Sequence, residues 1–318
     1  MSGIDLSSCA EEPIRIPEMI QPFGALLVFD PNRRLMRFSL NAEQLLNPRS
    51  PLNPGLLLTD IFDANSAIAV DSFISQLNTP GAKQAFFAQL MIREQQYGAC
   101  FYRSGQFDVV ELVPTLAGRS FQERFSGLQD EIQRLMHLAE MDVQLNHVAK
   151  VIKEAIGFDR VMVYRFDTDY NGVVCAEAKQ PEQEAFLGLH YPASDIPPQA
   201  RELYKENLVR FIADVEYTGS GFSEWEHGAL DMSQSVLRSI SPLHIQYMKN
   251  MGVRSTLVGS LLSNGELWGL VACHNLEPTC YDYALIELFR WLVIYCGNAI
   301  EVARLRDTEK RRDRKSVV

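Results

Sequence analysis

Three segments of this 318-residue chain combine titratable side chains with residues that otherwise suit burial. They cover residues 191–201, 237–253 and 267–274. The first contains the carboxylate of Asp195, the second contains the imidazole of His244, and the third is a mostly apolar run that ends in His274. The chain has no phosphate-binding glycine loop, paired-carboxylate site or nucleophile elbow, so these groups do not suggest catalysis.

Each segment alone also has a purely structural interpretation. Ser194 or Asp195 could cap a helix that is entered through proline and runs from Gln199 to Glu206. His244 could be a hydrogen-bonded core histidine, since a lone histidine on a helix usually is. His274 could be a strand-end histidine bonded to backbone. Taken one by one, the segments leave these alternatives open.

The first third of the chain has the alternation and the turn residues of an antiparallel sheet. An apolar run at Gly24–Phe29 is followed, across the turn Asp30-Pro31-Asn32, by a candidate hairpin partner at Arg34–Phe38. Three further strands are expected at residues 85–92, 97–103 and 106–114. We therefore predict a five-stranded antiparallel sheet with short helices.

A change to helical periodicity near residue 120 marks a domain boundary. Apolar residues from Phe121 to Ile156 recur with the period of an α-helix up to Gly157, which predicts one long amphipathic helix. A second helix is predicted over Tyr283–Leu305. The segment Arg304–Lys315 is dense in charge of both signs and is expected to be the solvated end of that helix.

The second domain is expected to contain another antiparallel sheet. Its first strands are predicted at Arg160–Phe166 and Gly172–Ala178. The clearest local signal is Asn264-Gly265 between the strand-like runs Ser255–Ser263 and Glu266–His274, because Asn-Gly in that position requires a type I′ hairpin turn. The chain is therefore expected to be an α+β protein with two domains.

The composition fits two globular domains and excludes several classes of function. Hydrophobic residues make up 47% of the chain and charged residues 22%, which is typical of folded domains. The formal net charge of -10 argues against a nucleic-acid partner, because phosphate contacts require a basic surface. The six cysteines form no CxxC pair and have no regular spacing, so neither a zinc site nor a disulfide framework is indicated.

Targeting signals are not found in the sequence. The N-terminus lacks the basic and apolar regions of a signal peptide, and no apolar run is long enough to span a bilayer. Leu6-Ser7-Ser8-Cys9 resembles a lipoprotein attachment box but lacks the apolar run that must precede one. A soluble, cytoplasmic protein without a membrane partner is expected.

Taken together, the three polar segments closely resemble the signature blocks of phytochrome GAF domains. The matching stretches are PASDIP at 192–197, LRSISPLHIQYMKNMGV at 237–253, LWGLVACH at 267–274 and, for the opening strand of that domain, FDRVMVYRF at 158–166. Near the N-terminus, CAEEPI from Cys9 onward and IQPFG at 20–24 resemble the entry to a bacteriophytochrome PAS domain. The resemblance covers essentially the whole chain in the right order.

This resemblance implies an α+β fold of two domains. Residues 1–120 would form an N-terminal cysteine segment and a PAS domain, and residues 121–318 a GAF domain with a C-terminal connecting helix. Each domain would have a central antiparallel β-sheet flanked by helices, with long helices connecting and ending the chain. A figure-of-eight knot would join the domains, although residues 216–234 are short for the loop through which the N-terminus threads in this family.

The resemblance also implies a light-sensing module that binds biliverdin IXα covalently and responds by Z/E isomerisation of the bilin. Such a flat, mostly apolar tetrapyrrole with two propionates requires an apolar cleft with a few convergent polar groups. Cys9 would form the thioether to the ring A vinyl group, because phytochromes with the other known anchor have cysteine at the position of Leu243. The family usually has histidine where this chain has Phe23.

Roles for the polar site residues follow from the same resemblance. Arg210 and Arg238 would bind the propionates through paired hydrogen bonds, helped by Ser241. His244 would lie near the inner rings and share a water with the pyrroles. The Asp195 carbonyl would accept from the pyrrole N–H groups, and its carboxylate would change partners as ring D turns.

The remaining residues would surround the far end of the bilin. His274 would hydrogen-bond the ring D carbonyl, and the rings of Tyr164, Tyr191 and Tyr247 would enclose that ring. Further contacts are implied for Ile196, Pro197, Tyr204 and Thr256.

The implied partners are the linear tetrapyrrole, a second copy bound through the GAF-end helices, and a downstream PHY and output domain. The chain is not expected to be an enzyme, since any histidine kinase activity would lie in a missing C-terminal module. The hairpin with which the PHY domain covers the pocket would also be missing, so the far-red state is expected to form incompletely. The main rival is a non-photosensory PAS–GAF module that binds a cyclic nucleotide or haem, or only dimerises.

Overall fold

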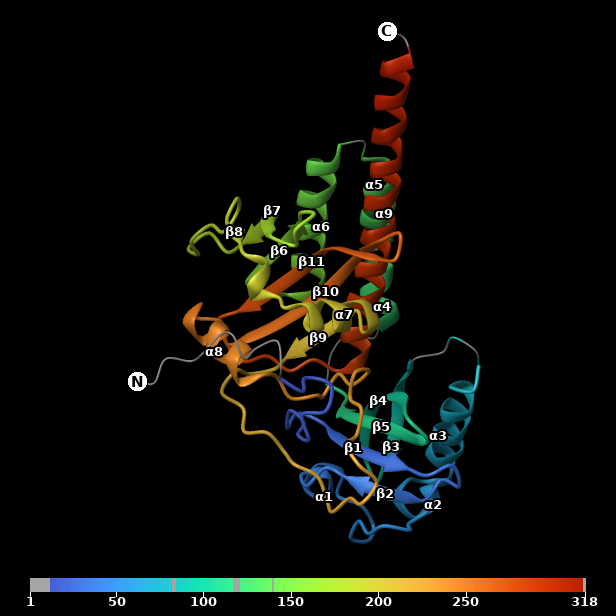
Figure 1. The fold of residues 1–318 in the computed structure, drawn as a ribbon. Coiled ribbons are helices and arrows are strands. Elements are labelled where there is room, and N and C mark those ends of the chain that lie inside the picture. Colours follow the sequence, from blue (N-terminus) through green and yellow to red (C-terminus); the bar gives the residue numbers. More distant parts are fainter. Residues whose placement is uncertain (1–11, 80, 82–83, 117–120, 139, 317–318) are drawn as a thin grey trace. The chain divides into compact units, whose positions relative to one another are not determined.

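The computed structural model of the chain describes residues 12–79, 81, 84–116, 121–138 and 140–316. These residues form two compact units. Unit 1 is drawn from the stretch up to Gly118, from Phe211–Arg254 and from Pro278–Glu287. Unit 2 is drawn from Arg119–Arg210, from Ser255–Glu277 and from Leu288 onward (Figure 1).

Unit 1 contains the five-stranded antiparallel sheet that the sequence predicts. Its strands are β1 (Ala25–Phe29), β2 (Leu35–Phe38), β3 (Gln84–Ile92), β4 (Gln95–Ser104) and β5 (Phe107–Pro114). They follow the order β2-β1-β5-β4-β3, and each neighbouring pair is antiparallel. Gly105 adopts a φ of +58°, which suits the tight turn that joins β4 to β5. The prediction for the first third of the chain is confirmed.

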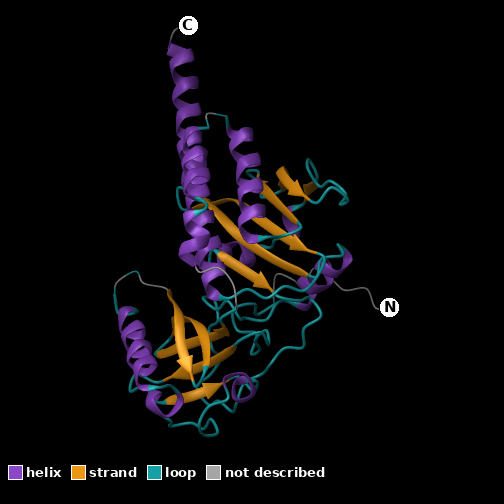
Figure 2. Ribbon diagram, turned by 180° about the vertical axis from the view of Figure 1, so that it is seen from behind, coloured by secondary structure: helices purple, strands orange, loops and turns teal. Residues whose placement is uncertain are grey.

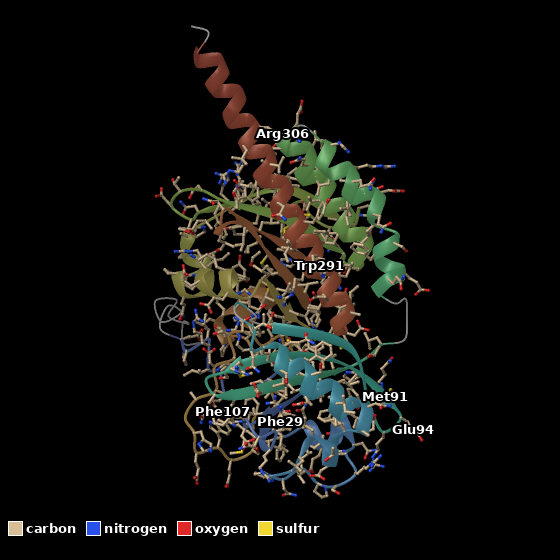
Figure 3. The ribbon with its side chains drawn as sticks, turned by 90° about the vertical axis from the view of Figure 1, so that its right-hand side faces the viewer. Phe29, Met91, Glu94, Phe107, Trp291 and Arg306 are labelled. Atoms are coloured by element: carbon tan, nitrogen blue, oxygen red, sulfur yellow. The ribbon has the colours of Figure 1, made fainter. Side chains whose placement is uncertain are left out.

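Short helices pack against this sheet. They are α1 (Ala42–Leu46), α2 (Leu58–Ile61) and α3 (Ala64–Gln76). A carboxylate oxygen of Asp63 accepts a hydrogen bond from Ser66 N at 2.9 Å and so caps the first turn of α3. α3 packs on β3 and β4, and α1 packs on β1 (Figure 1). Phe29, which is labelled in Figure 3, is fully buried in the resulting core.

The first described residues of unit 1 run between two parts of the same unit. Ile20 exchanges two backbone hydrogen bonds of 2.9 Å with Ser220 and also forms a bridge with Arg238. The buried side chain of Gln21 donates to Phe211 O at 2.8 Å. Phe23 packs edge-on against the ring of Phe211. The figure-of-eight knot stays a prediction.

Unit 2 contains a six-stranded antiparallel sheet. Its strands are β6 (Arg160–Phe166), β7 (Gly172–Lys179), β8 (His190–Tyr191), β9 (Val209–Ile212), β10 (Ser255–Ser263) and β11 (Glu266–Asn275), in the order β8-β7-β6-β11-β10-β9. Asn264 and Gly265 both have positive φ, as a type I′ turn requires. The predicted hairpin of β10 and β11 is confirmed.

One helix prediction for this unit is wrong. Residues 121–156 form not one long helix but three, α4 (Phe121–Ser126), α5 (Gln129–His137) and α6 (Met141–Ile156). Leu138 and Glu140 have extended backbone, and Gln144 Nε2 donates to Leu138 O at 2.7 Å, which satisfies a carbonyl that a continuous helix would bond internally. The apolar stripes of α5 and α6 both face α9 (Tyr283–Ser316), because side chains of all three helices line one small cavity.

The two faces of the unit 2 sheet are covered by different helices. A Cβ built on Gly259 of β10 would lie 2.4 Å from Val293 of α9, so α9 covers the face to which Gly259 points. The next residue along the strand, Val258, points to the opposite face and shares a cluster there with Tyr204 of α7 (Pro198–Glu206). Figure 2 shows the helices and strands of this unit from behind. None of the helices in the described residues has the length and apolar character that a bilayer span needs.

Candidate functional site

The candidate site residues fall into two groups, one in each unit. Unit 2 holds Tyr164, Tyr191, Asp195, Ile196, Pro197, Tyr204, Arg210, Thr256 and His274. Unit 1 holds Arg238, Ser241, His244 and Tyr247. Cys9 lies outside the described residues.

The α7 face of the unit 2 sheet is lined by aromatic and apolar side chains. The Tyr164 ring packs edge-on against Phe166 at 5.1 Å between centroids and lies 5.9 Å from the ring of Tyr191. Ile196 and Tyr204 join the same cluster. Four of the predicted residues are therefore brought together, one from β6 and three from the stretch 191–204.

A glycine makes room for the central tyrosine of this cluster. A Cβ on Gly172 of β7 would lie 1.7 Å from Cζ of Tyr164, so no other residue fits there while the ring keeps its place. Burial raises the pKa of Tyr164 to about 12, and the negative charges of Asp195 and Asp167 add to the shift. The phenol is consequently neutral at physiological pH and is able to donate a hydrogen bond.

Asp195 does not cap the helix that follows it. It ends the short 3-10 helix Ala193–Asp195, whereas α7 begins at Pro198 with Pro197 as its N-cap and has no side-chain cap bond. The capping interpretation of Ser194 or Asp195 is therefore wrong, and the reason is that the proline pair at 197 and 198 starts the helix without a side-chain acceptor. Asp195 is exposed, and partial desolvation raises the pKa of its carboxyl.

Thr256 and His274 form a polar pair on the same sheet face. They are directly opposite each other on β10 and β11, and both are buried. Within the described residues the Thr256 hydroxyl has no hydrogen-bond partner. A buried hydroxyl of this kind is a candidate contact for a polar group of a ligand.

A buried ion pair lies beside this polar pair and escaped the sequence analysis. Arg160 is directly opposite His274 on β6, and it binds Glu177 of β7 with both side chains almost fully buried. The guanidinium also lies 3.8 Å from the ring centroid of Phe186. The alternation of β6 could have indicated Arg160, since it shares a face with Tyr164, but its partner Glu177 comes from another strand.

The remaining predicted residue of this unit, Arg210, lies on β9 near Tyr204. Burial raises the pKa of the Tyr204 hydroxyl, and the positive charge of Arg210 acts in the opposite direction. The guanidinium is thus close enough to the aromatic cluster to affect its electrostatics.

In unit 1, Ser241 and His244 lie at the start of α8 (Pro242–Asn250). The Ser241 hydroxyl accepts hydrogen bonds from the backbone N–H groups of Leu243 and His244 and so caps the helix. The His244 ring is half-buried and stacks on Tyr247 one turn later, with an interplanar angle of 17°. His244 is therefore not a fully buried core histidine, and its ring shares one helix face with Tyr247.

Arg238 is the most deeply buried cation among the predicted residues, with 1% of its surface exposed. One terminal nitrogen donates to Ile14 O, and Nε has no hydrogen-bond partner within the described part of the chain. No carboxylate among the described residues forms an ion pair with it. A buried guanidinium in this state is suited to an anionic ligand group, because burial of an unpaired charge is costly.

The sequence matches two domain families in the order that the fold suggests. Residues 9–115 match the PAS fold, and residues 140–300 match the GAF domain. The fold and the site therefore define a PAS–GAF protein.

Bacteriophytochromes are similar over nearly the whole chain. The protein from Xanthomonas campestris pv. campestris (strain 8004) is 41% identical over 295 residues, which cover 90% of this chain and 46% of the relative. The protein from Pseudomonas aeruginosa is 33% identical over 95% of this chain and 41% of its own length. The chain thus spans less than half the length of these relatives.

Solved structures agree with this comparison. A variant of the chromophore-binding domain of Stigmatella aurantiaca bacteriophytochrome in the Pr state is 32% identical, with a TM-score of 0.82 and coverage of 92% of this chain and 98% of that one. The same domain of an unusual R. palustris bacteriophytochrome is 29% identical, with a TM-score of 0.82. This chain belongs to the bacteriophytochrome family and comprises its PAS and GAF domains.

Proposed function

We propose that this chain is a red/far-red light-sensing module that binds biliverdin IXα through a thioether to Cys9. One observation carries the proposal. On the α7 face of the unit 2 sheet, an aromatic cluster around Tyr164 continues into the buried polar pair Thr256 and His274. A flat, conjugated ligand with a few polar edges suits such a surface, because the rings take the apolar contacts and the polar pair can satisfy the edges.

The buried arginine supports the same ligand class. Arg238 is surrounded by protein and has no carboxylate partner among the described residues, so a propionate would neutralise it and occupy Nε. Arg210 would bind the second propionate, and Ser241 would assist from the start of α8.

The other residues would orient the bilin and respond to its movement. When bound, biliverdin supplies red-light absorption and Z/E rotation at the bridge between rings C and D. His274 would donate to the ring D carbonyl, and Tyr164, Tyr191 and Tyr247 would enclose that ring.

The Asp195 carbonyl would accept from the pyrrole N–H groups, with His244 near the inner rings. Ile196, Pro197, Tyr204 and Thr256 complete the proposed contacts.

Covalent attachment can be tested at Cys9. The purified chain is incubated with biliverdin, denatured and stained with zinc, which makes attached bilin fluoresce. We expect a fluorescent band for the natural sequence and none for Cys9→Ser. Cys280→Ser is the matched control, since Cys280 is an exposed thiol in the described part of the chain, and its band should persist. A band that survives in Cys9→Ser would contradict the assignment.

The wider context of the module is also proposed. We place its domain boundary near residue 120, with residues 1–120 as cysteine segment and PAS domain and 121–318 as GAF domain. A homodimer through α9 is supported by exposed apolar side chains along that helix, including Trp291, Ile294 and Leu305; Figure 3 marks Trp291 and Arg306 on it. A downstream PHY domain, an output module such as a histidine kinase, and a cytoplasmic location belong to the same proposal.

A further inference from the structure

The turn between β6 and β7 has an unusual backbone. A carboxylate oxygen of Asp167 accepts hydrogen bonds from Asp169 N and Asn171 N, both at 2.9 Å, which closes the turn. Within it Tyr170 adopts a φ of +63°, a backbone conformation that residues other than glycine rarely take. A strained backbone conformation is retained when contacts with the surrounding structure hold it in place. We therefore expect a partner residue that holds the ring of Tyr170.

That partner is Arg201 of α7. The Arg201 guanidinium carbon lies 4.2 Å from the centroid of the Tyr170 ring. From this position Arg201 Nη1 donates to Ile196 O at 2.7 Å and to Ala193 O at 3.3 Å. The same turn contributes a third bond, because Asn171 Oδ1 accepts from Ala193 N at 3.2 Å. The backbone is thus held on both sides of Asp195.

The side chain of Asp195 has fewer contacts than the backbone on either side of it. Within the described residues the Asp195 carboxylate makes no hydrogen bond or ion pair. In the same part of the chain, Arg201 donates its hydrogen bonds to the backbone carbonyls of Ala193 and Ile196 and not to this carboxylate. Asp195 therefore combines a fixed main chain with a carboxylate that is available for new partners. This combination is what a residue needs if its carbonyl must hold a ligand still while its side chain exchanges partners.

We infer that Arg201 and Tyr170 are positioning residues that fix the backbone of residues 193–196 for the photochemical step. The light-dependent part of this inference rests on the proposed function. The mechanical part does not, because the contacts lie entirely within unit 2 and require no ligand. The two parts can consequently be tested separately.

The mechanical part is tested by hydrogen exchange of the protein without biliverdin. In Arg201→Met and Tyr170→Gly, the amides of Ala193 and Asp195 should exchange about tenfold faster, because Arg201 either loses its hydrogen bonds to this surface segment or loses the ring that holds its guanidinium in place. Tyr170→Gly allows the positive φ without strain and removes the ring. Tyr170→Phe keeps the ring and should exchange as the natural protein does. Lys205→Met removes a cation one turn further along α7 and is the matched charge control.

The photochemical part is tested by the same variants with biliverdin. Zinc-stained gels should show normal attachment, while Arg201→Met and Tyr170→Gly should show a shifted absorption maximum and a clearly smaller light-induced change. Tyr170→Phe should restore both. Arg201→Lys keeps the charge but not the planar fork, so it should lie between the natural protein and Arg201→Met.

Three results would overturn the inference or its basis. Unchanged amide exchange in both Arg201→Met and Tyr170→Gly would show that these residues do not hold the loop. Faster exchange with an unaltered spectrum and light response would show that Arg201 and Tyr170 hold the backbone of residues 193–196 but do not affect the photochemical step. If the natural protein forms no pigment with biliverdin, the proposed function fails, and the light-dependent part of the inference fails with it.

Discussion

Gly172 lies directly against the ring of Tyr164, so that a methyl group on Gly172 would come within 1.7 Å of Cζ. Gly172→Ala should therefore displace the tyrosine ring and disturb the aromatic cluster. We expect a loss of stability of roughly 1–3 kcal/mol, the usual cost of overpacking, together with an altered bilin spectrum. Urea denaturation and absorption spectra check these outcomes.

Gly221→Ala is the control for that substitution, because its added methyl would meet only Leu40 at 3.7 Å. It should change stability by less than about 0.5 kcal/mol. Equal effects of the two variants would show that the Gly172 contact has no special cost.

A pH-dependent stability is expected from Glu111 of β5. Its side chain accepts hydrogen bonds from Ser235 Oγ and from Tyr283 Oη, and burial raises its pKa from 4.5 to about 7. The folded protein therefore holds a proton that the unfolded chain releases near pH 4.5. Stability from this group is fully present below pH 4.5 and is lost as the pH rises to about 7, by about 3 kcal/mol in total.

Glu111→Gln cannot titrate and should lack this dependence. We expect the difference in unfolding free energy between the two proteins to change with pH between 4.5 and about 7, in favour of the variant as the pH rises. Urea titrations at several pH values measure it. A difference that is the same at every pH would contradict the shifted pKa.

Arg238 offers a test that separates ligand binding from structure. Arg238→Met removes a buried charge that has no described carboxylate partner, so the unfolding free energy without ligand should change by no more than about 1 kcal/mol. Biliverdin affinity should fall by roughly 1.5–3 kcal/mol, or about ten- to a hundredfold in Kd, if the guanidinium binds a propionate. Fluorescence titration in the Cys9→Ser background gives that Kd. If Arg238→Met binds biliverdin as tightly as the natural protein, Arg238 does not bind a propionate.

Asp195→His tests the proposed switching role. Because Asp195 caps no helix, the substitution should change stability by less than about 0.5 kcal/mol, whereas loss of a true cap would cost about 1 kcal/mol. Biliverdin should still bind, but photoconversion should be impaired and far-red fluorescence should rise. Thermal unfolding and emission spectra of the same sample measure these outcomes, and intact photoconversion would exclude the switching role.

Local signals in the sequence predicted the strands and the hairpin well. Asn264 and Gly265 specify their turn through positive φ, which few other residue pairs tolerate, so no tertiary information is needed. The helical stretch from Phe121 to Ile156 was overestimated because its apolar periodicity continues across the break near Leu138. At this break the Gln144 side chain donates a hydrogen bond to the backbone carbonyl of Leu138. The periodicity of apolar residues does not reveal such a side-chain contact.

Most site residues were assigned because a recognisable motif contains them, whereas Tyr204, Arg210 and Thr256 were assigned from the family resemblance alone. Arg201 lies in the same block as Asp195, yet its role depends on Tyr170, which is thirty-one positions earlier in another turn. Arg160 and Glu177 likewise become partners only when β6 pairs with β7. Pairings between distant segments follow from strand register, and a single sequence does not specify that register.

The central claim, that this chain is a bilin-binding light sensor, is tested most directly by one absorption measurement. Purified protein is mixed with biliverdin, and its spectrum is recorded before and after red illumination, with Cys9→Ser alongside. We expect a strong red absorption band in the natural protein that decreases under red light and recovers afterwards. A spectrum that remains that of free biliverdin, or a bound pigment that does not respond to light, would contradict it.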